Sequence, residues 1–137
     1  MKKILFFLFI FFSFRVDAET LHIETVDGLL KFKTDIANTP ALQETGLMFK
    51  KSIPNNYTMT FLYDKPRLIS MWMKNTYIPL DMVFFDEKGI VVRLVENALP
   101  HDLTPIYSVF KVKGVIEMNA GLIKKYNISV GDKITIQ

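Results

Sequence analysis

Several polar residues interrupt an otherwise apolar stretch of the chain. The run "SMWMKNTYIPLD" covers residues 70–81, and Lys74, Asn75 and Asp81 stand there among Met, Trp and Leu. A further acid, Glu96, follows in the next apolar run. Side chains of these types can orient a small polar ligand, and two neighbouring carboxylates can also exchange protons with a substrate. The chemistry therefore depends on whether the fold brings these side chains together.

A predicted hairpin connects the two acids. The sequence "PLDMVFFDEKGIVVRLVEN" (79–97) indicates two strands joined by a turn at residues 86–89. With a four-residue turn, Asp81 faces Leu94, and Glu96 becomes its diagonal neighbour at about 7–8 Å along the backbone. At that separation two carboxylates can shift one another's pKa or share a cation. A turn of three or five residues would destroy this pairing.

We therefore predict a ligand-binding rim at this end of the hairpin, with Trp72 and Met73 as its floor. Its predicted members are Trp72, Lys74, Asn75, Asp81 and Glu96. The alternative is that both acids cap strand ends, where buried carboxylates are normally paired with backbone N–H groups or with a cation. No catalytic residue is assigned, and a pair of satisfied structural acids stays open beside a binding site.

The sequence contains none of the common catalytic, nucleotide-binding or metal-binding motifs that we considered. No G-x-S-x-G, P-loop, G-x-G-x-x-G, H-E-x-x-H or C-x-x-C pattern occurs, Cys is absent, and His22 and His101 are the two histidines. The methionines could suit Cu(I), but their spacing gives no ligand cluster. We expect no metal and no cofactor.

The N-terminus has the pattern of a secretory signal peptide. A basic "MKK" precedes an apolar run of 11 residues (4–14), and Val16-x-Ala18 suits cleavage after Ala18. A spanning helix needs about 20 apolar residues, so an uncleaved anchor is the weaker alternative. We predict a signal peptide at residues 1–18 and a single exported domain at 19–137, periplasmic or secreted, without a stable membrane span after cleavage.

The charge of the mature domain argues against nucleic acid as a partner. The whole chain carries 17 Lys and Arg against 14 Asp and Glu, a net charge of +3. Cleavage after Ala18 would remove three basic residues and one acidic residue, which leaves +1. Nucleic-acid binding needs a basic surface, so we expect a small polar ligand or a cell-envelope component instead. The oligomeric state stays open.

Turn and cap signals outline the fold. Asp27-Gly28 predicts a hairpin in which Ile23 faces Phe32, and "NTPALQETG" (38–46) predicts a short helix capped by Thr39 and ended by Gly46. Further strands are expected at 57–63, 68–73, 112–118 and 130–136, with a second short helix within 119–127. The predicted class is mainly β (α+β), a compact antiparallel β-barrel-like or sandwich domain with two short helices.

Four motifs carry a family resemblance. "GLMFKKSIP", "SMWMKNTYIPLDMVFFDEKGIVVRLVENALP", "GVIEMNAG" and "ISVGDKI" together resemble the DUF192 family, also called UPF0127, from residue 39 to 136. Lys50, Asn127 and Val130 depart from the family's usual Arg, Gly and Pro. The resemblance implies a small β-barrel-like or sandwich domain, often behind a signal peptide, with its signature over residues 72–81 and 96–98. It implies no established activity.

Three functions follow from these observations. The first is an exported, non-catalytic binding module that uses the predicted rim. The second is a carboxylate-based hydrolase or lyase of an envelope saccharide, with Asp81 and Glu96 as its acids and Trp72 and Tyr77 as platforms for sugar rings. The third is a purely structural or interaction module in which every signature residue maintains the fold.

Overall fold

The computed structural model describes residues 18–137. The predicted signal peptide lies outside the described residues, apart from Ala18, and stays a prediction. Within 18–137, no helix has the length and apolar character needed to cross a bilayer.

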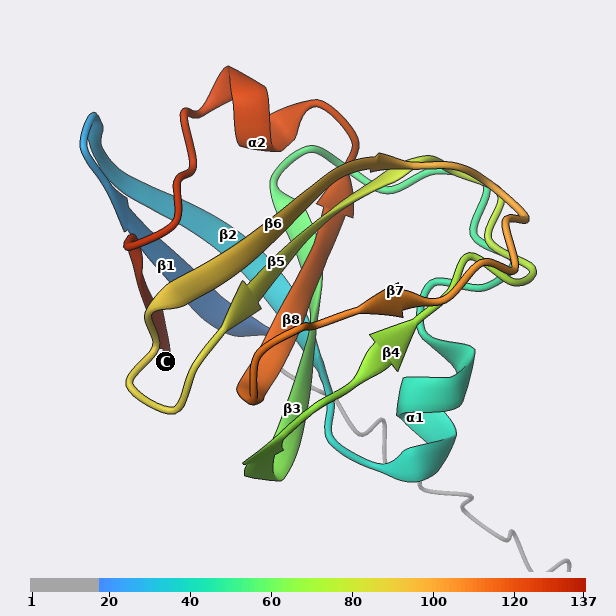
Figure 1. Ribbon diagram of the computed structural model, residues 1–137. Coiled ribbons are helices and arrows are strands. Elements are labelled where there is room, and N and C mark those ends of the chain that lie inside the picture. Colours follow the sequence, from blue (N-terminus) through green and yellow to red (C-terminus); the bar gives the residue numbers. More distant parts are fainter. Residues whose placement is uncertain (1–17) are drawn as a thin grey trace, which may run out of the picture.

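Seven of the nine strands in the described chain form one curled sheet, a half-barrel (Figure 1). Seven strands follow the order β6-β5-β8-β3-β2-β1-β9, and a separate two-stranded sheet pairs β4 with β7. The strands are β1 (Glu19–Thr25), β2 (Gly28–Ala37), β3 (Tyr57–Arg67), β4 (Ser70–Met71), β5 (Leu80–Phe85), β6 (Val91–Ala98), β7 (Ile106–Tyr107), β8 (Val112–Asn119) and β9 (Lys133–Ile136). The mainly β class with two short helices is confirmed.

One pair of strands departs from the antiparallel pattern. β2 and β3 run parallel, because the chain between them crosses back through helix α1 (Pro40–Thr45) and a long loop. Helix α1 has the predicted ends: the Thr39 side chain accepts a hydrogen bond from the Leu42 N–H, and Gly46 follows with a positive φ of 47°. The second helix, α2 (Leu122–Lys125), is a single turn.

The first hairpin is confirmed, but its predicted register is wrong. Ile23 pairs with Leu30 rather than Phe32, and Thr25 pairs with Gly28, so Val26-Asp27 forms the turn. The register differs by two residues, which leaves every side chain on its predicted face. Leu21, Ile23 and Phe32 are accordingly buried.

The sheet has apolar residues on both of its faces. All six residues of β5 are buried, as predicted for a strand that is covered on both sides. Val83 and Phe85 belong to one core cluster, and Met82 and Phe84 to the other. The cluster that contains Met82 extends toward α1 and β4, the region of the predicted rim.

The two ends of the sheet meet at one point, beside the second hairpin. Ile90 forms a β-bridge with Lys133 of β9, and the Ile134 N–H donates to the Gly89 carbonyl at 2.7 Å. A Cβ at Gly89 would lie 2.5 Å from the Ile134 oxygen, so this close approach requires glycine. The bridge draws the ends of the curled sheet together.

The second hairpin differs from the prediction in the length of its turn. The predicted four-residue turn is wrong, because Phe85 pairs with Val91 and the loop holds five residues, 86–90. The Asp86 carboxylate stabilises the longer loop by accepting hydrogen bonds from the Lys88 and Ile90 N–H groups, each at 2.9 Å. Val83 consequently faces Leu94, and a second irregularity follows between Leu80 and Met82.

Candidate functional site

Asp81 is a fully buried acid whose two oxygens are both occupied. Its Oδ1 accepts a hydrogen bond from the Asn97 N–H, and its Oδ2 accepts from the Gly121 and Ile123 N–H groups, all at 2.9 Å. Asn97 has a positive φ of 56° and lies at the irregularity of β6. The carboxylate therefore connects β5 to β6 and to the start of α2. This agrees with the alternative prediction that Asp81 is a structural acid paired with backbone N–H groups.

The predicted pairing of Asp81 with Glu96 is wrong. The observed register places Glu96 with Asn97 in the irregularity of β6 opposite Asp81, and the Glu96 side chain is exposed whereas the Asp81 side chain is buried. The two acids do not flank a common cleft, because Asp81 is directed at backbone N–H groups on β6 and α2. The arrangement that the hydrolase alternative required is not formed by these two residues.

Asn75 occupies a tight turn after β4. It adopts the left-handed conformation with a φ of 51°, which Asn tolerates better than most residues. Its carbonyl oxygen accepts a hydrogen bond from the Phe49 N–H at 2.9 Å, and the Thr76 N–H closes the turn onto the Met73 carbonyl at 3.2 Å. This backbone geometry positions the neighbouring Lys74.

Trp72 and Lys74 lie beside each other on the surface. The Trp72 side chain is 44% exposed, and the Lys74 Nζ lies 5.0 Å from the centroid of its ring. Met73 points the opposite way into the core with no exposed surface, so Trp72 and Met73 do not form a common floor. Trp72 and Lys74 instead form part of the wall of a pocket.

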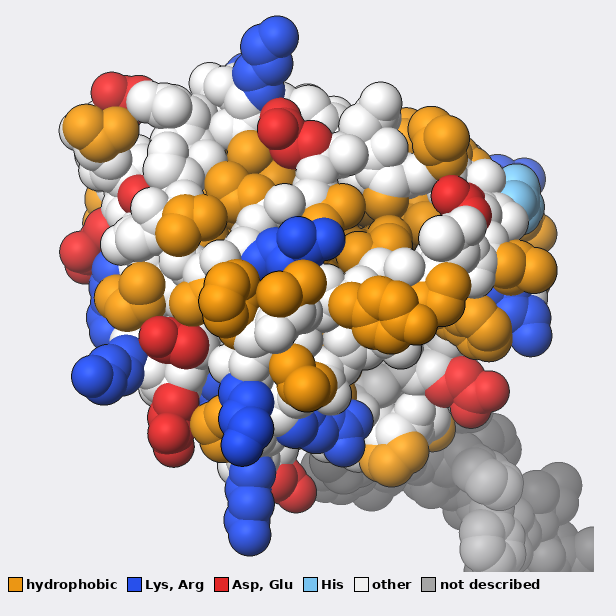
Figure 2. All heavy atoms as spheres, viewed as in Figure 1, with side chains coloured by type: hydrophobic (Ala, Val, Ile, Leu, Met, Phe, Trp, Pro, Cys, Tyr) orange, Lys and Arg blue, Asp and Glu red, His pale blue; other side chains and the backbone are white. Residues whose placement is uncertain are grey.

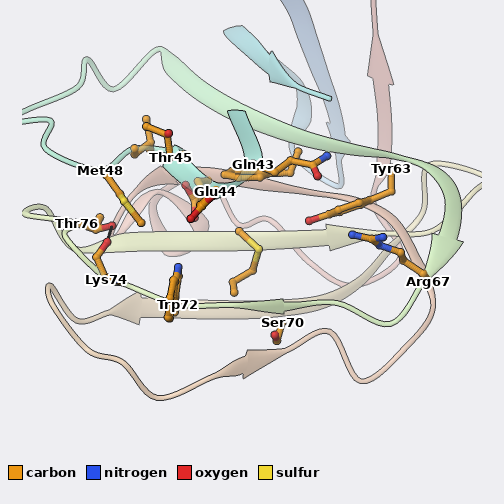
Figure 3. A pocket seen from close by; sticks show the side chains of 15 residues that line it. Gln43, Glu44, Thr45, Met48, Tyr63, Arg67, Ser70, Trp72, Lys74 and Thr76 are labelled. Carbon is orange, nitrogen blue, oxygen red and sulfur yellow. Dashed lines mark hydrogen bonds between the residues drawn. The ribbon is translucent and has the colours of Figure 1, made fainter. Parts of the chain in front are cut away.

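This pocket opens between α1, β3 and the segment around β4 (Figure 3). Its volume is about 220 Å³, and we call it the α1 pocket. The residues that line it are Gln43, Glu44, Thr45, Gly46, Leu47, Met48, Phe61, Tyr63, Arg67, Ser70, Met71, Trp72, Lys74, Thr76 and Glu117. Asn75, Asp81 and Glu96 are not among them, so two of the five predicted rim residues reach this site.

Backbone contacts hold the walls of the α1 pocket in place. The Gln43 side chain fixes α1 to the sheet by donating to the Ala37 and Leu62 carbonyls at 3.1 and 2.9 Å. On the opposite wall, β4 pairs with β7, and the Ser108 hydroxyl accepts from the Ile69 N–H at 3.0 Å. The pocket is therefore bounded by anchored elements.

Glu117 of β8 is the unusual member of the pocket. It pairs with Met59 on one side and Met82 on the other, a position where an apolar side chain would be expected. Only 4% of its surface is exposed, and no side-chain hydrogen bond to its carboxyl group is present within residues 18–137. Burial raises the pKa of Glu117 from 4.5 to about 8. The group is thus predominantly protonated at neutral pH.

Gly46 allows the wall to come close to this carboxyl group. A Cβ at Gly46 would lie 3.0 Å from Phe61 Cζ and 3.9 Å from Glu117 Oε2. The glycine also has the positive φ that ends α1. One residue therefore serves both the helix end and the pocket wall.

The cations of the pocket lie on aromatic rings. The Arg67 guanidinium carbon is 4.4 Å from the centroid of the Tyr63 ring, and Lys74 covers Trp72. Burial raises the pKa of Tyr63. The nearby positive charge of Arg67 lowers this pKa in part, and the nearby Glu117 raises it further. In Figure 3, Arg67 and Tyr63 lie at one end of the pocket and Lys74 and Thr76 at the other.

The site can bind or exchange a proton. Within residues 18–137, no three His, Cys, Asp or Glu side chains gather closely enough to hold an ion. A protonated carboxyl group with a second carboxylate, Glu44, in the same lining can donate to a ligand or accept a cation.

Glu117 was missed by the sequence analysis, although a signal was present. It is the one charged residue in "GVIEM" (114–118), a run whose other members are apolar or Gly. A lone acid inside an apolar strand is either paired or functional. The interruption of "SMWMKNTYIPLD" was more conspicuous, because it combined several polar types.

Fold and site together define a small, mainly β domain with a half-barrel sheet and a pocket built around a buried carboxyl group. The DUF192 family model, described as an uncharacterized ACR, matches residues 22–136. The chain belongs to the DUF192 family.

Two solved structures support this assignment. A protein of unknown function from Novosphingobium aromaticivorans is 34% identical with a TM-score of 0.83, covering 85% of this chain and 83% of that one. A protein from Sinorhizobium meliloti labelled "putative transcription regulator" is 35% identical with a TM-score of 0.84, covering 86% and 92%. No curated protein matches the chain.

Proposed function

We propose that this protein is an exported, non-catalytic binding domain whose α1 pocket receives a small polar ligand or a polar group of a cell-envelope component. The observation that carries the proposal is the Glu117 carboxyl group, which is buried in the pocket lining without a hydrogen-bond partner among the described residues. The signal-peptide pattern at residues 1–18 supports export.

The Glu117 carboxyl group is a polar group at an apolar position of the sheet. Leaving a buried polar group unsatisfied costs about 1–3 kcal/mol, so most such groups are paired. Asp81, also fully buried, has three backbone partners at 2.9 Å. The Glu117 oxygens are accessible from the pocket, because Arg93 Nε is the one enclosed side-chain atom without a partner within residues 18–137. A ligand that enters the pocket can hydrogen-bond to this carboxyl group in place of water, which is a reason for an acid to occupy an apolar position of β8.

The size of the pocket limits what can enter. Pockets for drug-sized ligands enclose about 300–1,000 Å³, and the α1 pocket encloses about 220 Å³. The ligand is therefore a small molecule, or the end group of a larger one whose remainder lies over Trp72 and Lys74 at the surface. On the face shown in Figure 2, Lys and Arg side chains are mixed with Asp and Glu side chains, without an extended patch of one charge. That the protein does not bind nucleic acid stays a prediction.

The test is a ligand screen that uses the single Trp as a reporter. Small envelope saccharides, short peptides and amino compounds are titrated while Trp72 fluorescence and thermal unfolding are recorded. We expect at least one compound to bind the wild type and Glu96→Gln, which changes an exposed acid outside the pocket lining, but not Glu117→Gln. A screen in which no compound distinguishes Glu117→Gln from the other two proteins would overturn the proposal.

A further inference from the structure

We infer that the group that enters the α1 pocket is a small organic cation, such as a primary ammonium, which supplies the counter-charge that Glu117 lacks. This inference rests on the proposed binding function and narrows it to one class of ligand. It is carried by the position of Glu117 among apolar neighbours and by the placement of the nearby cations.

The cations of the pocket are not directed at Glu117. The Arg67 guanidinium lies over the Tyr63 ring and the Lys74 ammonium over the Trp72 ring. No ion pair or hydrogen bond joins either of them to the Glu117 carboxyl group in the part of the chain that the structure describes. The protein thus leaves this acid without the partner that the buried carboxyl group of Asp81 has.

The remaining lining suits the alkyl part of such a cation. Phe61, Met48 and Met71 provide apolar surface, and Glu44 adds a second carboxylate from α1. Arg67 and Lys74 would repel a second positive charge on the ligand. The favoured ligand is therefore a monoamine or a zwitterion and not a polyamine.

Binding of a cation must displace a proton. At pH 7 the Glu117 carboxyl group carries its proton, because burial raises its pKa to about 8. When an ammonium group enters, the O–H bond breaks, the carboxylate keeps the electron pair, and the proton passes to the buffer. The other titratable or charged groups around the pocket are Glu44 of α1, Tyr57, Tyr63 and Arg67 of β3, and Lys74 after β4.

Two matched probes test the inference. 4-Aminobutan-1-ol carries an ammonium group at neutral pH, and 1,4-butanediol is its uncharged analogue of similar size. Binding to the full mature domain is measured by Trp72 fluorescence and by amide NMR shifts, and the heat is measured in phosphate and MOPS at pH 7 and in borate and CHES at pH 9, none of which carries a primary amine. Buffers with different ionisation heats reveal a released proton.

The expected result has three parts. The amine binds the wild type about tenfold or more tightly than the diol, since charge-assisted hydrogen bonds are stronger than neutral ones. Its binding releases up to one proton at pH 7 and much less at pH 9. Glu117→Gln loses the preference for the amine and the proton release, and Glu96→Gln keeps both.

The failures of the two proposals can be told apart. If the diol and the amine bind the wild type equally and neither binds Glu117→Gln, the inference that the ligand is a cation would be wrong. The proposal that the α1 pocket binds a ligand would be retained. Amine binding with unchanged affinity in Glu117→Gln would also overturn the inference. If neither probe nor any compound of the wider screen binds, the binding function itself falls.

Discussion

Two buried carboxyl groups of this protein have opposite surroundings. Asp81 receives three backbone hydrogen bonds, whereas Glu117 has no side-chain partner among the described residues and faces the α1 pocket. The same residue class thus serves structure in one place and is available to a ligand in the other. The surroundings of each carboxyl group, and not the type of residue, therefore determine its role.

The ionisation of Glu117 makes stability depend on pH. Its pKa is about 8 in the folded protein against 4.5 for an unburied Glu, so the folded state holds the proton more tightly. This contribution is fully present below pH 4.5 and is lost as pH rises to about 8, at a slope of up to ~1.4 kcal/mol per pH unit. Urea unfolding at pH 5 and pH 8 measures it, and we expect Glu117→Gln to lose this decline.

The exposed acid provides the control for this prediction. Glu96→Gln should retain the decline in unfolding free energy of the wild type, because Glu96 lies outside the α1 pocket lining. A Glu117→Gln protein whose stability falls between pH 5 and pH 8 as steeply as that of the wild type would contradict the assigned pKa.

At the scale of elements, Asp81 joins three of them at one point. Its oxygens hold β5, the irregularity of β6 and the first turn of α2 together. Helix α2 has a single turn and receives no side-chain cap from Gly121, its own N-cap residue. A helix this short depends on tertiary contacts, and the Asp81 carboxylate provides two of its N-terminal hydrogen bonds.

We therefore expect Asp81→Asn to destabilise the domain by about 2–3 kcal/mol, because the amide presents N–H donors to backbone N–H groups. Chemical denaturation measures the loss, and hydrogen exchange should become faster at the Gly121 and Ile123 amides. The control is Asp102→Asn, which changes an exposed acid with one backbone bond, to the Thr104 N–H. Equal stability of the two variants would show that Asp81 does not hold these elements together.

At the scale of the whole molecule, the α1 pocket is assembled from segments that are distant in the sequence. Glu117 contributes from β8, Tyr63 from β3 and Glu44 from α1. Anchoring of α1 through Gln43 and of β4 through β7 completes the enclosure. The site is a property of the assembled fold.

The proposal of export yields a prediction for the full chain. When the chain is produced in a bacterium, we expect the protein in the periplasmic or secreted fraction to begin at Glu19, as determined by N-terminal sequencing. Ala18→Arg should block this processing, because the cleavage site needs a small residue. Full-length protein in the membrane fraction would support the uncleaved anchor, and full-length protein in the cytoplasm would contradict export.

Features that depend on neighbouring residues could be predicted from the sequence. Thr39, Pro40 and Gly46 fixed the ends of α1, because caps and left-handed ends are local interactions. Alternating apolar residues identified the longer strands, and β5 was recognised as covered on both sides. The two-residue β7 was not predicted, and β4 is shorter than the strand expected at 68–73. The order of motifs also indicated the DUF192 family, which the family match confirms.

The strand registers and the site depend on contacts between remote parts of the chain. The loop at 86–90 is longer than predicted, and its Ile90 pairs with Lys133 of the distant β9. Glu96 lies in the irregularity of β6 and is exposed, whereas Asp81 is buried. Glu117 became a candidate because α1, β3 and β4 enclose it without supplying a partner. Burial and pKa depend on atoms from remote parts of the chain, and no pattern within one strand contains that information.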